Sequence, residues 1–168
     1  LGLPIIRHVE DTELGDEKND YWMPSSHRKD HFPRYNGRDE IPPSLRKAIH
    51  CFILVIAARR LRGDSKEDNS MLVHVTRFID VQGRVYEQIE SERQDIVNRL
   101  RNEVAHESLI SELHSLWEEG PESFLATTSS ISQREDKIFQ NPLHDWHDVE
   151  HELLEAVSSI EVRQINGG

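Results

Sequence analysis

Three histidines in the segment HDWHDVEH, residues 144–151, have the spacing of a metal site. His144, His147 and His151 follow one another by three and four residues, which places them on one face of a helix. With Asp148 beside them they form a candidate zinc-binding set. The apolar residues between them equally indicate an ordinary amphipathic helix whose histidines face water, and no cysteine of the segment offers a further ligand. We therefore expect no tight metal site here.

A set of acidic residues after position 120 has the order found in metal-dependent nucleases. Pro121 and Glu122 are followed by Glu135, Asp136 and Lys137, which gives an acid and then a Glu-x-Lys triplet. Such nucleases gather two carboxylates and a lysine around Mg²⁺ to activate water. The triplet adjoins a segment rich in Ser and Thr, with no predicted pair of strands to hold it. A chance occurrence on the surface is therefore the alternative interpretation, and we assign no catalytic residue.

Two groups of residues could contact the phosphates of a nucleic acid. Arg59, Arg60 and Arg62 end a predicted helix, where basic side chains are also favoured by the helix dipole alone. Thr76 and Arg77 close a short run of β-branched and apolar residues. Hydroxyl groups, arginines and backbone amides supply contacts to phosphate that do not depend on base sequence.

Asn166 and Gly167 would play the same part at the end of a second predicted strand, because glycine lets a backbone approach a ligand closely. For each of these groups, an ordinary position on the protein surface is the alternative interpretation. We predict a nucleic-acid-binding set made of Thr76, Arg77, Asn166, Gly167, Arg59, Arg60 and Arg62.

The elements that must position these residues are mainly helices. Apolar residues at helical spacing predict a central helix over 44–63, with Ser44 as a candidate N-cap and Gly63 just past the end. A buried strand at 71–76 should lead into a helix from about Asp80. Further helices are expected at about 106–119 and after Asn141-Pro142, and a last strand at 160–165.

We expect one domain, residues 1–168, which is mainly α with a minimal parallel strand pair, because a lone strand needs a partner and a long helical crossover joins parallel strands. The arm should be ordered but irregular, packed by its aromatic side chains, with His27 and His31 in structural roles. The parts are the arm at 1–43, the central helix at 44–63, a strand-helix unit at 70–100, an acidic helical insertion at 101–158, and a strand with a glycine turn at 159–168.

The charge is divided unequally along the chain, which has a net charge of −11. Residues 1–100 hold 16 Lys and Arg against 17 Asp and Glu, whereas residues 101–168 hold 4 against 14. An acidic surface repels phosphate, so the second part should meet a protein partner and not nucleic acid.

The composition indicates a protein without a membrane span. No apolar run approaches the roughly 20 residues that a transmembrane helix needs. The single cysteine, Cys51, excludes an internal disulfide and favours a cytoplasmic location. The first residue is not Met, and we expect the chain to be a piece of a larger protein.

Two stretches of the sequence carry a family resemblance. PPSLRKAIHCFILVIAARRLRG, followed by NSMLVHVTRFIDVQ, resembles the Z-one (Z1) domain family. That family is joined to superfamily-two helicase-like ATPases in bacterial restriction and defence proteins. The resemblance implies that the strand-helix unit is the start of a RecA-like lobe. No GxxxxGK[ST] phosphate loop occurs in the chain, so ATP and Mg²⁺ would belong to the parent protein and no cofactor to this chain.

These observations lead to a functional hypothesis with two alternatives. We expect an accessory and coupling module of an ATP-dependent DNA-processing or restriction-modification system. It would contact the DNA backbone near Thr76 and Arg77, and a nuclease subunit or other helicase lobes through its acidic helices. By itself the chain should hydrolyse neither ATP nor DNA. The alternatives are a metal-dependent endonuclease domain and a purely structural interaction domain.

Overall fold

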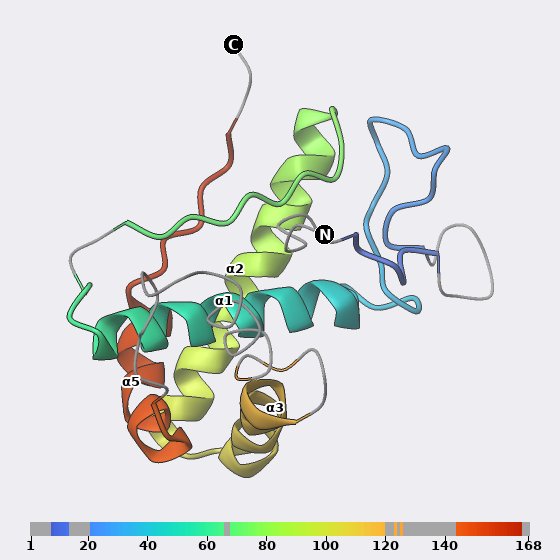
Figure 1. The fold of residues 1–168 in the computed structure, drawn as a ribbon. Coiled ribbons are helices and arrows are strands. Elements are labelled where there is room, and N and C mark those ends of the chain that lie inside the picture. Colours follow the sequence, from blue (N-terminus) through green and yellow to red (C-terminus); the bar gives the residue numbers. More distant parts are fainter. Residues whose placement is uncertain are drawn as a thin grey trace. The chain divides into compact units, whose positions relative to one another are not determined.

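The computed structural model describes residues 8–13, 21–65, 68–119, 123, 125 and 144–165, and these residues form a mainly helical protein. The helices are α1 (Pro43–Leu61), α2 (Ile79–Asn102), α3 (His106–Glu118) and α5 (Trp146–Ser158) (Figure 1). They confirm that the fold is mainly α and lie close to the predicted helices. None of the described helices is long and apolar enough to cross a membrane.

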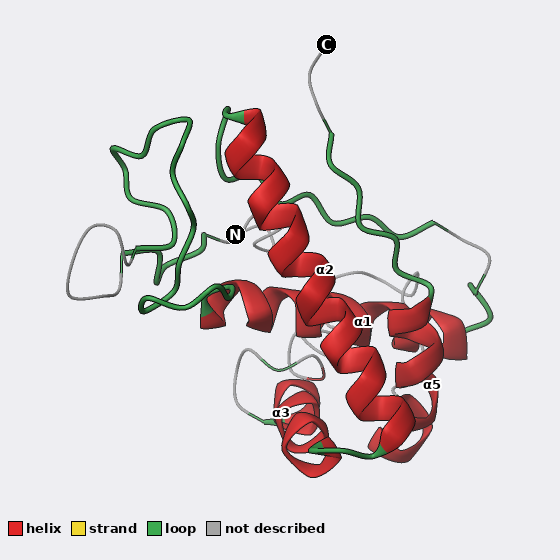
Figure 2. Ribbon diagram, turned by 180° about the vertical axis from the view of Figure 1, so that it is seen from behind, coloured by secondary structure: helices red, strands yellow, loops and turns green. Residues whose placement is uncertain are grey.

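The predicted parallel strand pair is wrong for the described residues. Figure 2 shows no strand, and the described residues contain only an isolated bridge between Tyr35 and Arg38. A strand is stabilised by a paired backbone, and the described residues place no such neighbour beside 71–76. Leu72, predicted to be buried, is 77% exposed. The 160–165 segment is joined to the start of α2 by a side chain instead, since Gln164 Nε2 donates to Ile79 O at 3.1 Å.

Helix α1 begins and ends with recognisable capping chemistry. It starts at Pro43 and not after Ser44, and the backbone N–H of Ser44 donates to the carboxylate of Asp11 at 3.1 Å. The negative charge of Asp11 suits a helix N-terminus. Gly63 takes a left-handed conformation (φ 91°), its N–H donates to Arg60 O, and the N–H of Asp64 reaches Arg59 O. This is a Schellman motif, as the position of Gly63 predicted.

The described chain divides into two compact units. The first unit combines residues up to Ala48 with Val73–Glu92 and the segment from Val162. The second unit combines Ile49–Leu72 with Arg93–Glu161. Both α1 and α2 therefore contribute one end to each unit.

In the first unit the irregular arm packs on the first half of α2. Trp22 is 1% exposed, and its Nε1 donates to Gln88 Oε1 at 2.8 Å. Gln88 Nε2 in turn donates to Pro33 O at 2.8 Å and to Asp39 Oδ1 at 2.6 Å. The side-chain amide of Gln88 therefore has partners for both its nitrogen and its oxygen, as a buried polar group requires. Through these bonds it holds three parts of the arm against one residue of α2. Ile41 adds a buried aliphatic side chain to the same core.

In the second unit, amphipathic helices bury one face each. Leu109, Leu113 and Trp117 are the buried residues of α3, and α3 contacts α5. Val149, Leu153, Ala156 and Val157 are those of α5, at helical spacing. Helix α5 is capped by Asp145, whose side chain accepts the N–H of Asp148 at 3.0 Å.

Candidate nucleic-acid interface

The buried residue Thr76 holds the start of α2 in place through hydrogen bonds. This residue is only 5% exposed, and its hydroxyl oxygen accepts the N–H of Phe78 at 3.2 Å. Its carbonyl oxygen accepts Gln82 Nε2 at 2.7 Å. These bonds turn the extended segment into the helix, so the Thr76 side chain is engaged within the protein. Its predicted contact with phosphate stays a prediction, and the exposed member of the pair is Arg77.

His27 connects the arm to this turn. Its Nδ1 lies 2.8 Å from Pro24 O and its Nε2 lies 2.7 Å from Thr76 Oγ1. A carbonyl can only accept, so Nδ1 carries the proton in the neutral ring and Nε2 accepts the hydroxyl proton of Thr76. The ring also meets Phe78 edge-on, with centroids 5.6 Å apart. The structural role expected of His27 is thus specific: it holds Thr76 and Phe78 in place.

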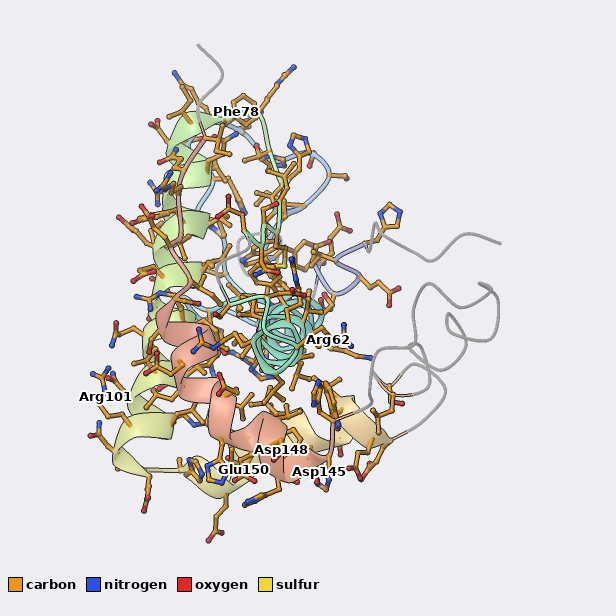
Figure 3. The ribbon with its side chains drawn as sticks, turned by 60° about the vertical axis from the view of Figure 1, so that its left-hand side comes forward. Arg62, Phe78, Arg101, Asp145, Asp148 and Glu150 are labelled. Atoms are coloured by element: carbon orange, nitrogen blue, oxygen red, sulfur yellow. The ribbon has the colours of Figure 1, made fainter. Side chains whose placement is uncertain are left out.

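Three arginines lie over aromatic rings beside this turn, of which Arg77 and Arg34 are exposed and Arg84 is half-buried. The guanidinium carbon of Arg77 is 5.1 Å from the centre of the Phe78 ring. Those of Arg84 and Arg34 are 4.3 and 5.2 Å from the centre of the Phe32 ring. We call these five residues, all in the first unit, the arginine–aromatic surface. Figure 3 shows Phe78 at the start of α2.

The guanidinium groups of the arginine–aromatic surface have no carboxylate partner within 4.0 Å among the described residues. Elsewhere in the same unit Arg46 is paired, since its Nε lies 2.8 Å from Glu92 Oε1. A guanidinium that rests on a ring keeps its N–H donors for another acceptor. The surface can therefore offer donors to an anionic ligand.

The three arginines at the end of α1 do not form one site. Arg59 Nη1 donates to Asn69 Oδ1 at 2.6 Å and to Asp68 O at 3.3 Å, which ties the following loop to the helix. Arg60 Nε donates to Glu152 Oε2 on α5 at 2.7 Å. The Nε of Arg62 is buried. Arg59 and Arg60 therefore have structural bonds within the second unit, and their predicted contacts with phosphate remain untested.

The candidate metal ligands do not converge. Among the parts of the chain that the structure describes, no group of three His, Cys, Asp or Glu side chains could hold a metal ion. His147 and His151 do meet, with their Nε2 atoms 3.3 Å apart and their rings edge to face. Their spacing of four residues on α5 accounts for this contact.

Several predicted site residues lie outside the described residues. Glu135, Asp136 and Lys137, with Pro121 and Glu122, belong to this group, so the nuclease pattern stays a prediction. The same holds for Asn166 and Gly167.

The second unit is strongly acidic. Its described residues include six Lys and Arg against fourteen Asp and Glu, whereas those of the first unit include nine against ten. Asp145, Asp148 and Glu150 lie together at the start of α5 (Figure 3). The acidic charge faces solvent at both Asp145 and Asp148. This surface suits a basic partner and disfavours a phosphate chain.

The fold and the site define a helical domain with a basic and aromatic surface in one unit and an acidic second unit. The model of the Z1 domain matches residues 44–168. The chain belongs to the Z1 domain family, as its sequence resemblance indicated. No curated protein and no solved structure shows significant similarity to the chain.

Phe32, Arg34 and Arg84 are not among the site residues that the sequence predicted. Phe32 and Arg34 lie before the residues that match the family, in the segment SHRKDHFPRYNGR. Basic and aromatic residues alternate there, which is a composition typical of nucleic-acid-binding surfaces. That signal was available, but it was interpreted only as packing of the arm.

Proposed function

We propose that this Z1 domain is an accessory and coupling module of an ATP-dependent DNA-processing or restriction-modification system. In this proposal the first unit contacts the DNA backbone, and the acidic second unit docks on a protein partner. The partner would be a nuclease subunit or the helicase-like lobes of the parent protein, which would supply ATP and Mg²⁺.

One contrast carries this proposal. Arg77 presents its guanidinium over a ring at the start of α2, whereas Arg60 in the second unit is committed to Glu152 at 2.7 Å. Free N–H donors on an exposed arginine are suited to a phosphate oxygen. The excess of acids in the second unit would repel the same phosphates, which supports a division of labour between the units.

Binding by the isolated chain should be weak and independent of base sequence. The logarithm of the affinity should fall linearly with the logarithm of the salt concentration, with a shallow slope because few phosphates are contacted. Fluorescence anisotropy with a short labelled DNA, over about 50–200 mM salt, measures both quantities. Absence of any DNA binding at the lowest salt would contradict the proposed function.

The coupling role needs a second readout. In a protein that carries this domain with its ATPase, Arg77→Ala should lower DNA affinity and DNA-stimulated ATP hydrolysis together. The charge reversals Glu150→Lys and Glu155→Lys should not weaken DNA binding, but they should lower the stimulation of ATP hydrolysis by DNA. If the reversals abolish DNA binding while Arg77→Ala changes nothing, the roles of the two units are wrongly assigned.

A further inference from the structure

We infer that the arginine–aromatic surface binds a single strand of nucleic acid, with the unpaired bases stacked on Phe32 and Phe78 and their arginines. This inference rests on the proposed function, and it adds the form of the ligand and the residues that would select it. It is carried by the exposure of Phe32, by the unpaired guanidinium groups, and by the way several segments converge on the surface.

Phe32 is an exposed ring that the protein holds in place. It is 39% exposed although it is large and apolar. Arg84 from α2 and Arg34 from the arm both lie over it, at 4.3 and 5.2 Å from the ring centre. A ring placed at the surface with cations beside it can stack on a nucleobase, because every base has a π-face. Arginine itself can extend such a stack through its planar guanidinium.

The ring of Phe78 belongs to the same surface. His31 and His27 have their ring centres 5.9 Å apart, and His27 meets Phe78 at 5.6 Å. His31 directly precedes Phe32 in the chain, so the arm brings Phe32 and the rings of His31 and His27 into the same part of the first unit. Arg77 then lies over the last of these rings at 5.1 Å.

The dimensions fit a short single strand. Phe78 and Arg84 are six residues apart at the start of α2, which corresponds to about 9 Å along a helix axis. At the 3.4 Å spacing of stacked nucleotides this length accommodates about three of them. Three arginines beside two exposed or half-exposed rings are the kind of side chains that form a positively charged surface with stacking platforms.

The charge near the rings complements a phosphate chain. Residues 21–40 contain Arg28, Lys29, Arg34 and Arg38 against Asp30, Asp39 and Glu40, and Arg38 Nη1 lies 3.9 Å from Glu40 Oε1. All four basic side chains are exposed. A duplex would satisfy these charges through its phosphates, but its paired bases are not available to the rings. The rings therefore favour the single strand.

The test compares four labelled oligonucleotides of equal length on the full 168-residue chain at low salt. They are a single-stranded DNA, the same strand with abasic sites in place of its bases, the DNA duplex and a single-stranded RNA. We expect the single-stranded DNA to bind about fivefold or more tightly than the abasic strand, which keeps the phosphates and lacks the bases. The single-stranded RNA should bind about as tightly as the single-stranded DNA, because stacking uses the faces of the bases and not the 2′-hydroxyl group.

Two substitutions separate stacking from charge. Phe32→Ala should remove most of the preference for the strand with bases, while the salt dependence stays unchanged. Arg84→Lys should keep the salt dependence and reduce the same preference, because lysine retains the charge without the planar group. Val104→Ala is the matched control, since Val104 is 67% exposed in the second unit and should have no effect on binding.

The outcomes distinguish the inference from the proposed function. Equal affinity for the abasic strand, or an unchanged preference in Phe32→Ala, overturns the stacking site while DNA binding through phosphates survives. Tighter binding of the duplex overturns it as well. If none of the four oligonucleotides binds, the proposed function fails together with the inference.

Discussion

The two units of this Z1 domain use arginine in different ways. In the second unit Arg60 and Arg99 are bonded within the protein, to Glu152 Oε2 at 2.7 Å and to Ala105 O at 2.9 Å. At the start of α2, in the first unit, Arg77 and Arg84 lie over Phe78 and Phe32. The first use stabilises helices, whereas the second leaves donors for a ligand. The presence of an arginine in the sequence is therefore not enough to predict an anion-binding site. The partners of its guanidinium group in the structure must be known as well.

The largest expected effect concerns the arm on which the arginine–aromatic surface is built. Trp22 is 1% exposed, so Trp22→Ala should lower the free energy of unfolding by about 3–5 kcal/mol. Chemical denaturation measures this loss, and amide hydrogen exchange should show lost protection in the first half of α2. Phe32→Ala is the control and should cost much less, because Phe32 is partly exposed. A loss below about 1 kcal/mol for Trp22→Ala would mean that the arm does not pack as described.

The next effect concerns the buried amide that joins the arm to α2. Gln88→Ala should destabilise the protein by about 1–3 kcal/mol, because it leaves Trp22 Nε1 and other buried polar atoms without their partner. Gln94, on the same helix, is exposed, and its bonds lie at the surface: Nε2 donates to Asn98 Oδ1 at 3.2 Å, and Oε1 accepts from Arg93 Nη2 at 3.5 Å. Gln94→Ala should therefore change stability by no more than about 0.5 kcal/mol. Equal costs for the two variants would contradict the bonds described for Gln88.

A smaller effect is expected in the second unit, at the cap of α5. Asp145→Ala should cost about 0.5–2 kcal/mol of stability, since Asp148 N–H loses its acceptor. Asp145→Ser, which keeps a capping oxygen, should restore most of this loss. Thermal unfolding of the three proteins provides the comparison. A serine variant as unstable as the alanine variant would show that the Asp145 charge, and not capping, is responsible.

The smallest effects test the contrast between the arginines themselves. Arg60→Ala should cost at most about 1 kcal/mol, because the ion pair with Glu152 is partly exposed. Arg77→Ala should change stability by less than about 0.5 kcal/mol, since no carboxylate depends on it among the described residues. Denaturation curves of both variants check this order. A larger loss of stability in Arg77→Ala than in Arg60→Ala would mean that Arg77 has the structural role and that Arg60 is the better candidate for binding a ligand.

The helices could be predicted from the sequence because their signals are local. The apolar periodicity and the position of Gly63 are properties of single segments, and they are confirmed by the structure. The irregular, unpaired conformation of residues 71–76 could not be predicted in this way. The β-branched composition of this segment reflects only a preference, and a strand forms only where a neighbouring backbone pairs with it.

The candidate site was predictable only in part. Arg77 was identified from its position after an apolar run, but the role of Thr76 depends on the hydrogen bond that its hydroxyl donates to His27, which lies 49 residues away in the sequence. The contact between Arg84 and Phe32 likewise joins two distant segments. Such contacts result from the packing of the arm on α2 around Gln88. The spacing of residues within one segment does not predict this packing.

The most direct test of the division between the units compares an arginine just before α2 with one in the last turn of that helix. Arg77→Ala and Arg101→Ala remove the same charge, and both side chains are exposed, but Arg101 ends α2 in the second unit (Figure 3). In a salt titration of single-stranded DNA binding, Arg77→Ala should weaken binding about three- to tenfold at low salt and reduce the salt slope by about 0.7. Arg101→Ala should change neither by a measurable amount. Equal losses in the two variants would show that only net charge matters, and would contradict a binding surface at the start of α2.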